Sequence, residues 1–292
     1  MYNCIINPNA GRGDGRKLGA DVEKFLKGHG HEVVLHICTE NHEASSAAKK
    51  ASAAGSQGII GVGGDGTVQA IAAGILEDRD KCNTPLGIIS CGSGNDWKRS
   101  FPGAEDCLNA LLTGSTKTID AIRANGMACL NIANVGIDAK IVRTALPLKK
   151  TLGKYAYVIA SLVNINRRMN TRLTIEIAGG ERLQGDFTLV AVCNGQYYGG
   201  NMHIAPSAVM DDGQITLCIV KGLRPSRAFV LLPKMLVGRH TGDRAVRFLE
   251  CEGVRLISDR PQVLCLDGNL YEAPEVIDFR ILPGAVRVFA GG

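Results

Sequence analysis

Residues 58–68 read GIIGVGGDGTV: an apolar run, Gly58–Val62, passes through a cluster of glycines into a second apolar segment, Val68–Leu76. A short apolar run that enters a helix through glycines is typical of the strand–loop–helix unit of a parallel sheet. Glycine lets a backbone approach a phosphate closely, and the N-terminus of the next helix offers unpaired N–H groups. This stretch therefore predicts a phosphate-binding loop.

The same alternation of strand and helix continues through the first 120 residues. The predicted strands are Cys4–Ile6, Val33–Ile37, Gly58–Val62 and Leu86–Ser90. The predicted helices are Lys17–Gly28, Ala44–Ala54, Val68–Leu76 and Ala104–Leu112. This order predicts a parallel sheet that is covered by helices.

After Asp120 the pattern changes to many short strands with two helices between them, Thr151–Arg168 and Arg224–Val237. The predicted strands are Ala128–Val135, Leu173–Ala178, Phe187–Cys193, Ile215–Val220, Val254–Ser258, Val263–Leu266, Val276–Leu282 and Val286–Phe289. Such a series favours an antiparallel sandwich.

The predicted fold class is α/β plus all-β, with an N-terminal parallel-sheet nucleotide-binding domain and a C-terminal antiparallel β-sandwich domain. We place the domains at residues 1–120 and 121–292, and whether the last strand, near 283–292, packs back on the first domain is left open.

Composition excludes several classes. The hydrophobic fraction of 45% and the charged fraction of 21% are those of a globular protein. No apolar run approaches the roughly 18 residues of a membrane span, and no basic region precedes the apolar N-terminus as in a signal peptide. The ten cysteines form no C-x-x-C pair and the six histidines no metal-binding spacing, which favours reduced thiols in a cytoplasmic protein. A net charge of +5 fits a phosphate-rich ligand or an anionic membrane surface, and it fits equally well a protein with no charged partner.

Three glycine-containing loops follow predicted parallel strands: Asn7–Gly13, Gly63–Thr67 and Gly92–Asp96. Loops at the carboxyl ends of parallel strands share one edge of the sheet, where ligands bind. One such loop is weak evidence, because glycine also makes ordinary turns, but three on one edge are stronger.

The middle loop also fits the dinucleotide pattern G-x-G-x-x-G. That fold needs an acidic residue about 20 positions further on, and the candidates Asp78 and Asp80 fall in a polar turn before a strand. No G-x-x-x-x-G-K-[ST] motif is present, which argues against a P-loop enzyme. The informative residue is Asp65, since a carboxylate repels phosphate unless a metal ion or ordered water stands between them.

At these residues the sequence resembles the diacylglycerol kinase and sphingosine kinase-like family of lipid kinases, of the bacterial diacylglycerol kinase type. The segment Gly63–Thr67 matches the GGDGT signature, which NAD kinases and, more loosely, phosphofructokinases share. Further matches follow in family order over nearly the whole chain: Asn7-Pro8…Gly11, Gly92–Asp96, Gly199-Gly200…Ala205-Pro206…Asp211-Asp212-Gly213, and Asp267-Gly268.

The resemblance implies ATP and Mg²⁺ as cofactors. The implied ATP contacts are Asn7, Pro8, Asn9, Ala10, Gly11, Thr39, Gly63, Gly64, Asp65, Gly66, Thr67, Val68, Gln69, Ser93 and Asn95. The implied carboxylate network around a catalytic Mg²⁺ is Asp65, Asp96 and Asp120. A second, structural Mg²⁺ is expected at the Asp212 carboxylate with the carbonyls of Val209 and Gln214, oxygen ligands that this hard cation prefers.

The resemblance also implies that Asp267 is the general base for the lipid hydroxyl, with Asp65 and Asp96 as the other catalytic carboxylates. The family pattern at this position is Asp-Gly-Glu, whereas this chain has Asn269 as its third residue. We favour Asp267 as the base because one carboxylate suffices. From the residues alone, a hairpin turn is the better explanation of Asp267-Gly268 between apolar runs.

The expected activity is an ATP-dependent lipid kinase of phospholipid metabolism, acting on diacylglycerol first, and on a sphingoid base or another long-chain alcohol next. The alternatives are an NAD kinase-like enzyme and a catalytically weak lipid- or nucleotide-binding protein. We expect a cytoplasmic protein with transient contact at the membrane surface and no nucleic-acid partner, and a homodimer is left open. The apolar helix Thr151–Arg168 reads first as a buried helix and second as one that faces lipid.

Overall fold

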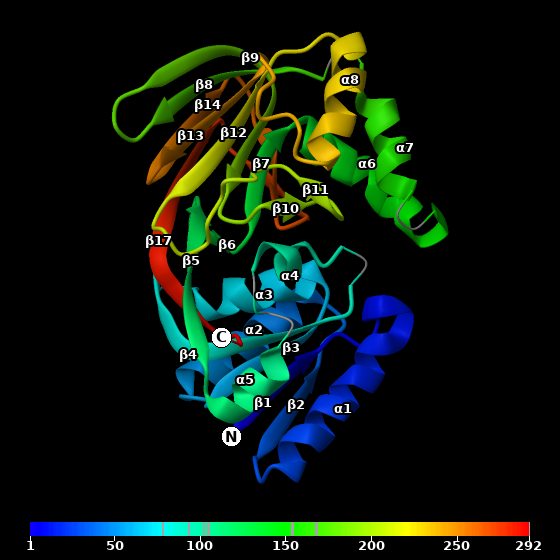
Figure 1. Ribbon diagram of the computed structural model, residues 1–292, viewed down its shortest axis with the longest axis vertical. Coiled ribbons are helices and arrows are strands. Elements are labelled where there is room, and N and C mark those ends of the chain that lie inside the picture. The colour runs from blue at the N-terminus through cyan, green and yellow to red at the C-terminus, as the bar shows by residue number, and fades with distance from the viewer. Residues whose placement is uncertain are drawn as a thin grey trace.

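The computed structural model describes residues 1–77, 79–92, 94–101, 103, 106–152, 155–166 and 169–291, without the side chains of Arg12, Lys149, Lys150 and Val158. The chain folds into two lobes that stack end to end, and both termini lie in the first (Figure 1). The fold class predicted from the sequence is confirmed: a parallel sheet with helices is followed by an antiparallel sandwich.

In the first lobe four parallel strands follow the order β4-β3-β1-β2. Their bounds are β1 Tyr2–Ile6, β2 Val33–Ile37, β3 Gly58–Gly63 and β4 Cys82–Ser90. Side chains that alternate along β1 enter two different cores, since Cys4 and Ile6 pack with α1 whereas Ile5 packs with α2 and α3. The sheet is therefore covered on both faces, as its near-continuous apolar strands require. The helical segments of this lobe are η1 Ala10–Gly13, α1 Asp14–Gly28, α2 Asn41–Ala53, α3 Asp65–Ile75, α4 Asp96–Ser100 and α5 Cys107–Thr113.

The second lobe is built on antiparallel strands in the order β16-β15-β7-β9-β8-β14-β17, with β12 beside β9 and β13 beside β12. The strands are β5 Thr116–Ala124, β6 Met127–Cys129, β7 Ile132–Gly136, β8 Thr171–Ile177, β9 Arg182–Cys193, β12 Ile215–Lys221, β13 Val246–Cys251, β14 Gly253–Ser258, β15 Gln262–Leu266, β16 Asn269–Ala273 and β17 Val276–Phe289, with a separate small hairpin of β10 Tyr197–Tyr198 and β11 Met202–His203. One apolar core lies inside the sandwich, and a second lies under α6 Ile137–Leu152, α7 Tyr155–Asn164 and α8 Pro225–Leu236.

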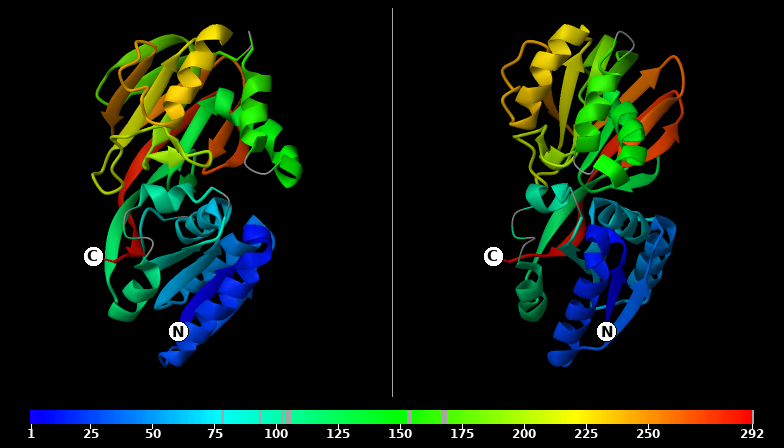
Figure 2. Two further views of the ribbon diagram at one scale, coloured as in Figure 1. Left: turned by 45° about the vertical axis from the view of Figure 1, so that its right-hand side comes forward. Right: turned by 90° about the vertical axis from the view of Figure 1, so that its right-hand side faces the viewer.

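The last strand joins the lobes. Its first part pairs with β14 in the sandwich, and its end pairs in parallel with β4, where Val288 faces Leu86. Figure 2 shows β17 in red, running from one lobe into the other. Strand β5, which contains residue 120, pairs with β17 along this path. The domain boundary that we place at residue 120 therefore falls inside a strand, and it stays a prediction.

Several predicted elements differ from the structure. The strand predicted over Ala128–Val135 is two strands, β6 and β7. It is interrupted because the backbone N–H groups of Leu130 to Ile132 donate to the side chain of Asp267. The helix predicted over Thr151–Arg168 is wrong in both bounds. Its first two residues belong to the end of α6, which begins at Ile137, and the rest corresponds to α7, which ends at Asn164. Arg167 and Arg168 lie outside the described residues. The two strands predicted at the C-terminus are one, with a register shift between Leu282 and Val286.

Candidate functional site

The three glycine loops lie against one another at the carboxyl edge of the parallel sheet. A Cβ atom placed on Gly64 would lie 3.0 Å from the Cα of Gly92, and one placed on Gly11 would lie 2.5 Å from the carbonyl oxygen of Cys91. Gly11 also has a φ of +61°, which disfavours other residues. Glycine is therefore required at Gly11 by both space and conformation, and the loops form one continuous surface of backbone.

The middle loop ends in the N-terminus of α3. This helix begins at Asp65, and its N-cap, Gly64, has no side chain that could accept from the first N–H groups. Unpaired N–H groups at a helix N-terminus, together with the helix dipole, attract anions. The N–H groups of Thr67 and Val68 already donate to the carbonyl of Gly64, so the donors that suit a phosphate are those at the very start of the helix. The predicted nucleotide contacts at Gly63–Thr67 stay a prediction, and the side chain of Thr67 is buried.

Asp65 and Asp96 come together across Gly94. A Cβ atom at Gly94 would lie 2.5 Å from Oδ2 of Asp65 and 3.3 Å from Oδ2 of Asp96, so both carboxylates border this residue. The backbone N–H groups of Gly200 and Asn201, in the β10–β11 turn of the second lobe, donate to Asp96 at 2.7 and 2.9 Å. Asp96 thus ties the first lobe to the second.

The pKa of Asp96 reflects this position. Burial raises the pKa to about 6 from an ordinary 3.8, the charge of Asp65 adds to the rise, and the two backbone donors and Arg99 oppose it. Asp65 itself accepts from the N–H of Trp97 at 3.2 Å. Two carboxylates held this close repel each other, and a bound cation would relieve the repulsion.

These residues fit a magnesium ion that a nucleotide brings with it. Asn95 adds a side-chain oxygen, Oδ1, that is buried and has no hydrogen-bond partner within the described part of the chain. Mg²⁺ is commonly held by one or two carboxylates together with substrate phosphates and water. Across the described residues no three His, Cys, Asp or Glu side chains gather as a metal-binding group, so the fit is to a shared ion rather than to an all-protein cage.

The structure places Asp120 with a different segment. Its carboxylate accepts from the N–H groups of Gly213 and Gly284, both at 2.7 Å. Burial raises the pKa of Asp120, the two backbone donors oppose the rise, and the nearby charges of Asp212 and Asp211 add to it. Asp120 thus fixes the 211–214 turn through Gly213, and its part in a carboxylate network with Asp65 and Asp96 stays a prediction.

The predicted structural metal site lies in that same turn. Asp212 accepts from the backbone N–H of Gln214 at 2.9 Å, and Val209, Asp212 and Gln214 are all exposed. The exposed carboxylates of Asp211 and Asp212 lie near the buried Asp120 and make this turn acidic, and Mg²⁺ at Asp212 stays a prediction.

Asp267 sits in a tight turn between β15 and β16. Asp267 and Gly268 have φ values of +47° and +88°, and Leu266 pairs with Asn269, which is the geometry of a two-residue hairpin loop. The hairpin reading of this Asp-Gly pair is therefore correct, and the carboxylate has a further role in the structure.

The Asp267 carboxylate is held by the break between β6 and β7. Oδ1 accepts from the N–H groups of Asn131 at 3.0 Å and Ile132 at 2.9 Å and from the thiol of Cys129 at 3.1 Å. Among the described residues, Oδ2 accepts only from the N–H of Leu130, at 2.9 Å. Burial raises the pKa of Asp267, and these donors oppose the rise. These bonds explain why the predicted strand Ala128–Val135 is interrupted.

Asn269 connects this turn to the first lobe. Its Nδ2 donates to Oε1 of Gln69 at 2.9 Å, and its Oδ1 accepts from Nδ2 of Asn41 at 3.2 Å. A Cβ atom on Gly66 would lie 3.9 Å from the same Oδ1. The Asp-Gly turn of the second lobe is therefore next to the glycine loop of the first. Sequence reasoning missed Asn41, since a polar residue at a helix start carries no signal for a partner more than 200 residues away.

The other predicted nucleotide contacts are placed as follows. Thr39 is exposed beside the capping box of α2, and its N–H donates to Glu43 at 2.9 Å. Asn7 accepts from the N–H of Asn9 at 3.0 Å, which shapes the first loop. The side chain of Val68 is in the core, so only its backbone can face a ligand. Ser93 lies outside the described residues.

Two family models together match nearly the whole chain. The diacylglycerol kinase catalytic domain matches residues 2–124, and the YegS C-terminal NAD kinase beta sandwich-like domain matches residues 131–290. Among curated proteins, the diacylglycerol kinase of Bacillus subtilis (strain 168) is 29% identical over 272 residues, covering 91% of this chain and 88% of the relative. The probable lipid kinase YegS of Salmonella schwarzengrund is 27% identical over 272 residues, covering 90% and 88%.

Solved structures show the same fold. A crystal structure of a diacylglycerol kinase from Bacillus anthracis str. Sterne has a TM-score of 0.74 at 20% identity and covers 100% of this chain and 97% of its own. An NAD kinase from Archaeoglobus fulgidus in complex with ATP is more distant, with a TM-score of 0.55 at 13% identity over 99% and 93% of the two chains. At these identities the likeness concerns the fold alone.

Proposed function

The chain belongs to the family of the YegS C-terminal NAD kinase beta sandwich-like domain, here joined to a diacylglycerol kinase catalytic domain, and on that premise we propose that it is an ATP-dependent lipid kinase. The acceptor that we propose first is the hydroxyl of diacylglycerol, with a sphingoid base or another long-chain alcohol as the next choice. The named relatives support this class of reaction.

The glycine edge would hold the nucleotide phosphates. The N-terminus of α3 and the backbone of the three loops supply N–H groups, and glycine at Gly11 lets the loops close together. Asp65 and Asp96 would hold Mg²⁺, and Oδ1 of Asn95 lies beside Gly92 in the same loop. When bound, the ion neutralises the charge of the transferring phosphoryl group.

The Asp267 carboxylate would accept the proton of the lipid hydroxyl at Oδ2. Oδ1 already accepts three donors, whereas Oδ2 accepts one from a described residue, which leaves it room for a substrate hydroxyl. A base must lie within hydrogen-bond reach of the proton that it takes. The same donors would fix the carboxylate in place while substrate binds.

One observation carries this proposal: Asn269, two residues after Asp267, lies against the Gly66 backbone and Gln69. The proposed base and the phosphate loops thus face each other from the two lobes. An acceptor between the lobes would meet the terminal phosphate there, and positioning of this kind accounts for much of phosphoryl-transfer catalysis.

Two other functions keep a basis in the chain. An NAD kinase-like enzyme would share the fold, but its structural likeness is the weaker one. A catalytically weak lipid- or nucleotide-binding protein is suggested by Asn269, an amide where the family pattern has a carboxylate. We propose action at the cytoplasmic membrane surface, and no helix within the described ranges is long and apolar enough to cross a membrane.

The test is transfer of ³²P from ATP to diacylglycerol, sphingosine or NAD, the two lipids being dispersed in detergent micelles. Labelled phosphatidic acid is the expected product, and Asp65→Asn should abolish it without loss of the folded state. Asp21→Asn, a change at an exposed carboxylate of α1, is the matched control and should leave turnover unchanged. Labelled NADP, or ATP binding without any labelled product, would refute the proposal.

A further inference from the structure

Helix α8 is apolar on the side that faces away from the protein. Its inner side, Ala228, Leu231 and Met235, packs in the core cluster under the helices. The outer side carries Phe229, Val230, Pro233 and Leu236, and Val237 follows at the end of the helix. We call these five residues the α8 stripe. At 3.6 residues per turn, they lie on the side of the helix opposite the buried residues.

The α8 stripe is open to solvent. Phe229 is 46% exposed, Val230 51%, Leu236 46% and Val237 62%. The outer side of a helix on a globular protein is normally polar, and a contiguous apolar patch on a surface marks a site of contact with another molecule or a membrane. We therefore expect the α8 stripe to contact another molecule or a membrane.

The charge around α8 identifies the partner. Residues 221–247 contain seven Lys or Arg and one acidic residue, Asp243, a balance of 7 − 1 = +6 with His neutral, against +5 for the whole chain. Asp243 is engaged by Arg227 at 2.7 Å and by Lys234 at 3.5 Å, and Arg247 is engaged at 2.6 Å by Glu181, which lies outside this segment. Arg239 and Arg244, just beyond the helix, are exposed. A partner for this surface must be apolar inside and anionic at its face, as an anionic bilayer is.

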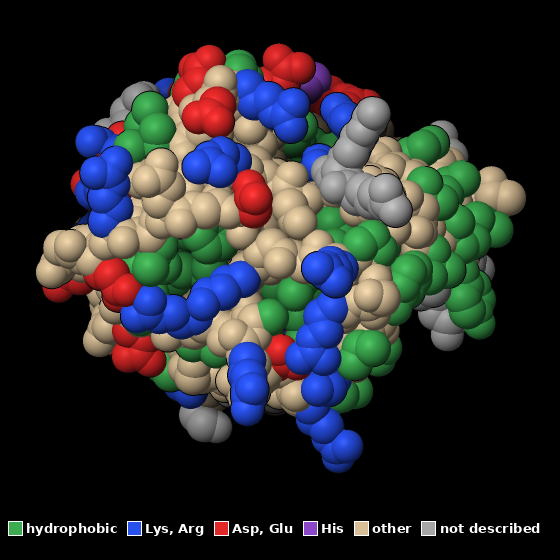
Figure 3. Space-filling view, turned by 90° about the horizontal axis from the view of Figure 1, so that it is seen from above, with side chains coloured by type: hydrophobic (Ala, Val, Ile, Leu, Met, Phe, Trp, Pro, Cys, Tyr) green, Lys and Arg blue, Asp and Glu red, His purple; other side chains and the backbone are tan. Residues whose placement is uncertain are grey.

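The neighbouring helix α7 extends the apolar surface. Ala156 and Ala160 pack in the same cluster as α8, while Tyr155 at 62%, Leu162 at 52% and Val163 at 62% exposure face outward. Both views of Figure 2 show α7 and α8 on one side of the second lobe. Figure 3, seen from above, shows hydrophobic side chains gathered on the part of the surface that projects at the right. Lys and Arg side chains lie over the middle of the same face.

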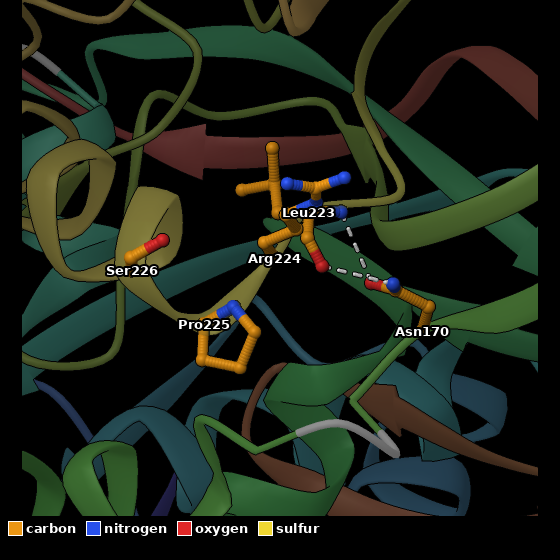
Figure 4. Close-up of a pocket in the computed structure, with 5 residues that line it drawn as sticks. All are labelled: Asn170, Leu223, Arg224, Pro225 and Ser226. Carbon is orange, nitrogen blue, oxygen red and sulfur yellow. Dashed lines mark hydrogen bonds between the residues drawn. The ribbon is translucent and has the colours of Figure 1, made fainter.

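A cavity of about 570 Å³ opens at the N-terminal end of α8, lined by Asn170, Leu223, Arg224, Pro225 and Ser226 (Figure 4). Asn170 forms one wall, since it donates to the carbonyl of Leu223 at 3.0 Å and accepts from its N–H at 3.2 Å. The exposed side chain of Arg224 adds a cation at this end of the helix. The basic border thus continues at both ends of the α8 stripe.

We propose that the α8 stripe docks on an anionic lipid bilayer, with its apolar side chains in the acyl region and the surrounding Arg side chains at the headgroups. This docking proposal depends on the proposed function in one respect, that a lipid kinase must reach its acceptor in a membrane. Its test needs neither ATP nor acceptor, so docking can fail while the kinase activity stands, and the reverse.

The experiment is flotation of the full chain with vesicles of phosphatidylcholine alone or of phosphatidylcholine and phosphatidylglycerol at equal parts. The wild type should float with the anionic vesicles and much less with the neutral ones. Phe229→Ser with Leu236→Ser should weaken binding to the anionic vesicles by at least tenfold. Leu112→Ser, a change at a 41% exposed leucine of α5, is the matched control and should bind like the wild type.

A second variant keeps the test valid if the apolar double variant does not fold. Arg239→Glu with Arg244→Glu alters two exposed side chains and should reduce binding to anionic vesicles by at least tenfold while leaving the weak binding to neutral vesicles unchanged. Unchanged flotation of either folded variant would overturn the proposal. So would a wild-type dimer in gel filtration that Phe229→Ser with Leu236→Ser dissociates, because the stripe would then be covered by a second copy of the chain.

Discussion

Replacing Asp267 should separate its structural role from its catalytic one. In Asp267→Ala, three buried backbone N–H groups, those of Leu130, Asn131 and Ile132, lose their acceptor. Each buried donor left unpaired costs about 1–3 kcal/mol, so the free energy of unfolding should fall by about 3–9 kcal/mol. This is a large share of the stability of an ordinary domain, and we expect Asp267→Ala to fold poorly.

Asp267→Asn should be much milder. The amide oxygen can take the place of Oδ1, with its three donors, and the amide nitrogen then faces the N–H of Leu130. One lost acceptor costs about 1–3 kcal/mol, or roughly 2–12 °C in melting temperature. If Oδ2 is also the general base, turnover should fall by about 10²–10⁴-fold, with little change in ATP affinity.

The assay is thermal melting together with lipid phosphorylation at a temperature well below both transitions. Asp259→Asn, at an exposed carboxylate of the same lobe, is the control and should change neither quantity. Melting of Asp267→Asn at the wild-type temperature would refute the structural argument. Wild-type turnover in the folded Asp267→Asn protein would refute the assignment of the base.

Three further predictions concern other carboxylates and the amide beside the base. Burial raises the pKa of Asp138 to about 6, so the native state binds more protons than the unfolded state between about pH 4 and 6, and wild-type stability falls as the pH rises through that range. Asp138→Asn should therefore be more stable than the wild type at pH 7, by up to about 3 kcal/mol, and the two proteins should differ little at pH 4. Urea unfolding at both pH values measures this difference, and a variant less stable than the wild type at pH 7 would contradict the prediction. If Asp212 holds Mg²⁺, added MgCl₂ should raise the melting temperature of the wild type but not of Asp212→Ala, and equal shifts in both proteins would disprove the site. Asn269→Glu keeps an acceptor for the amide of Asn41 and should change turnover by no more than a few-fold, whereas activation of a silent protein would show that the missing carboxylate was the base.

Local pattern was enough to predict the parallel sheet and its loops. Strands such as Gly58–Gly63 are short apolar runs between glycine turns, and these features depend on residues that are neighbours in the chain. The position of the loops at one edge follows from the parallel order of β1, β3 and β4. The pairing of Asp65 with Asp96 was also within reach, because both follow strands that end at that edge.

Only the tertiary structure determined which backbone groups the other carboxylates bind. Asp96 is bound to a turn 104 residues away, Asp120 to one 93 residues away, and Asp267 to a strand break 135 to 137 residues away. It also decided that β6 and β7 are separate strands, although the sequence from Ala128 to Val135 is continuously suited to one. A buried carboxylate takes whatever backbone donors the folded chain brings to it, because leaving either group unpaired is costly, and no periodicity along the sequence records which donors those are.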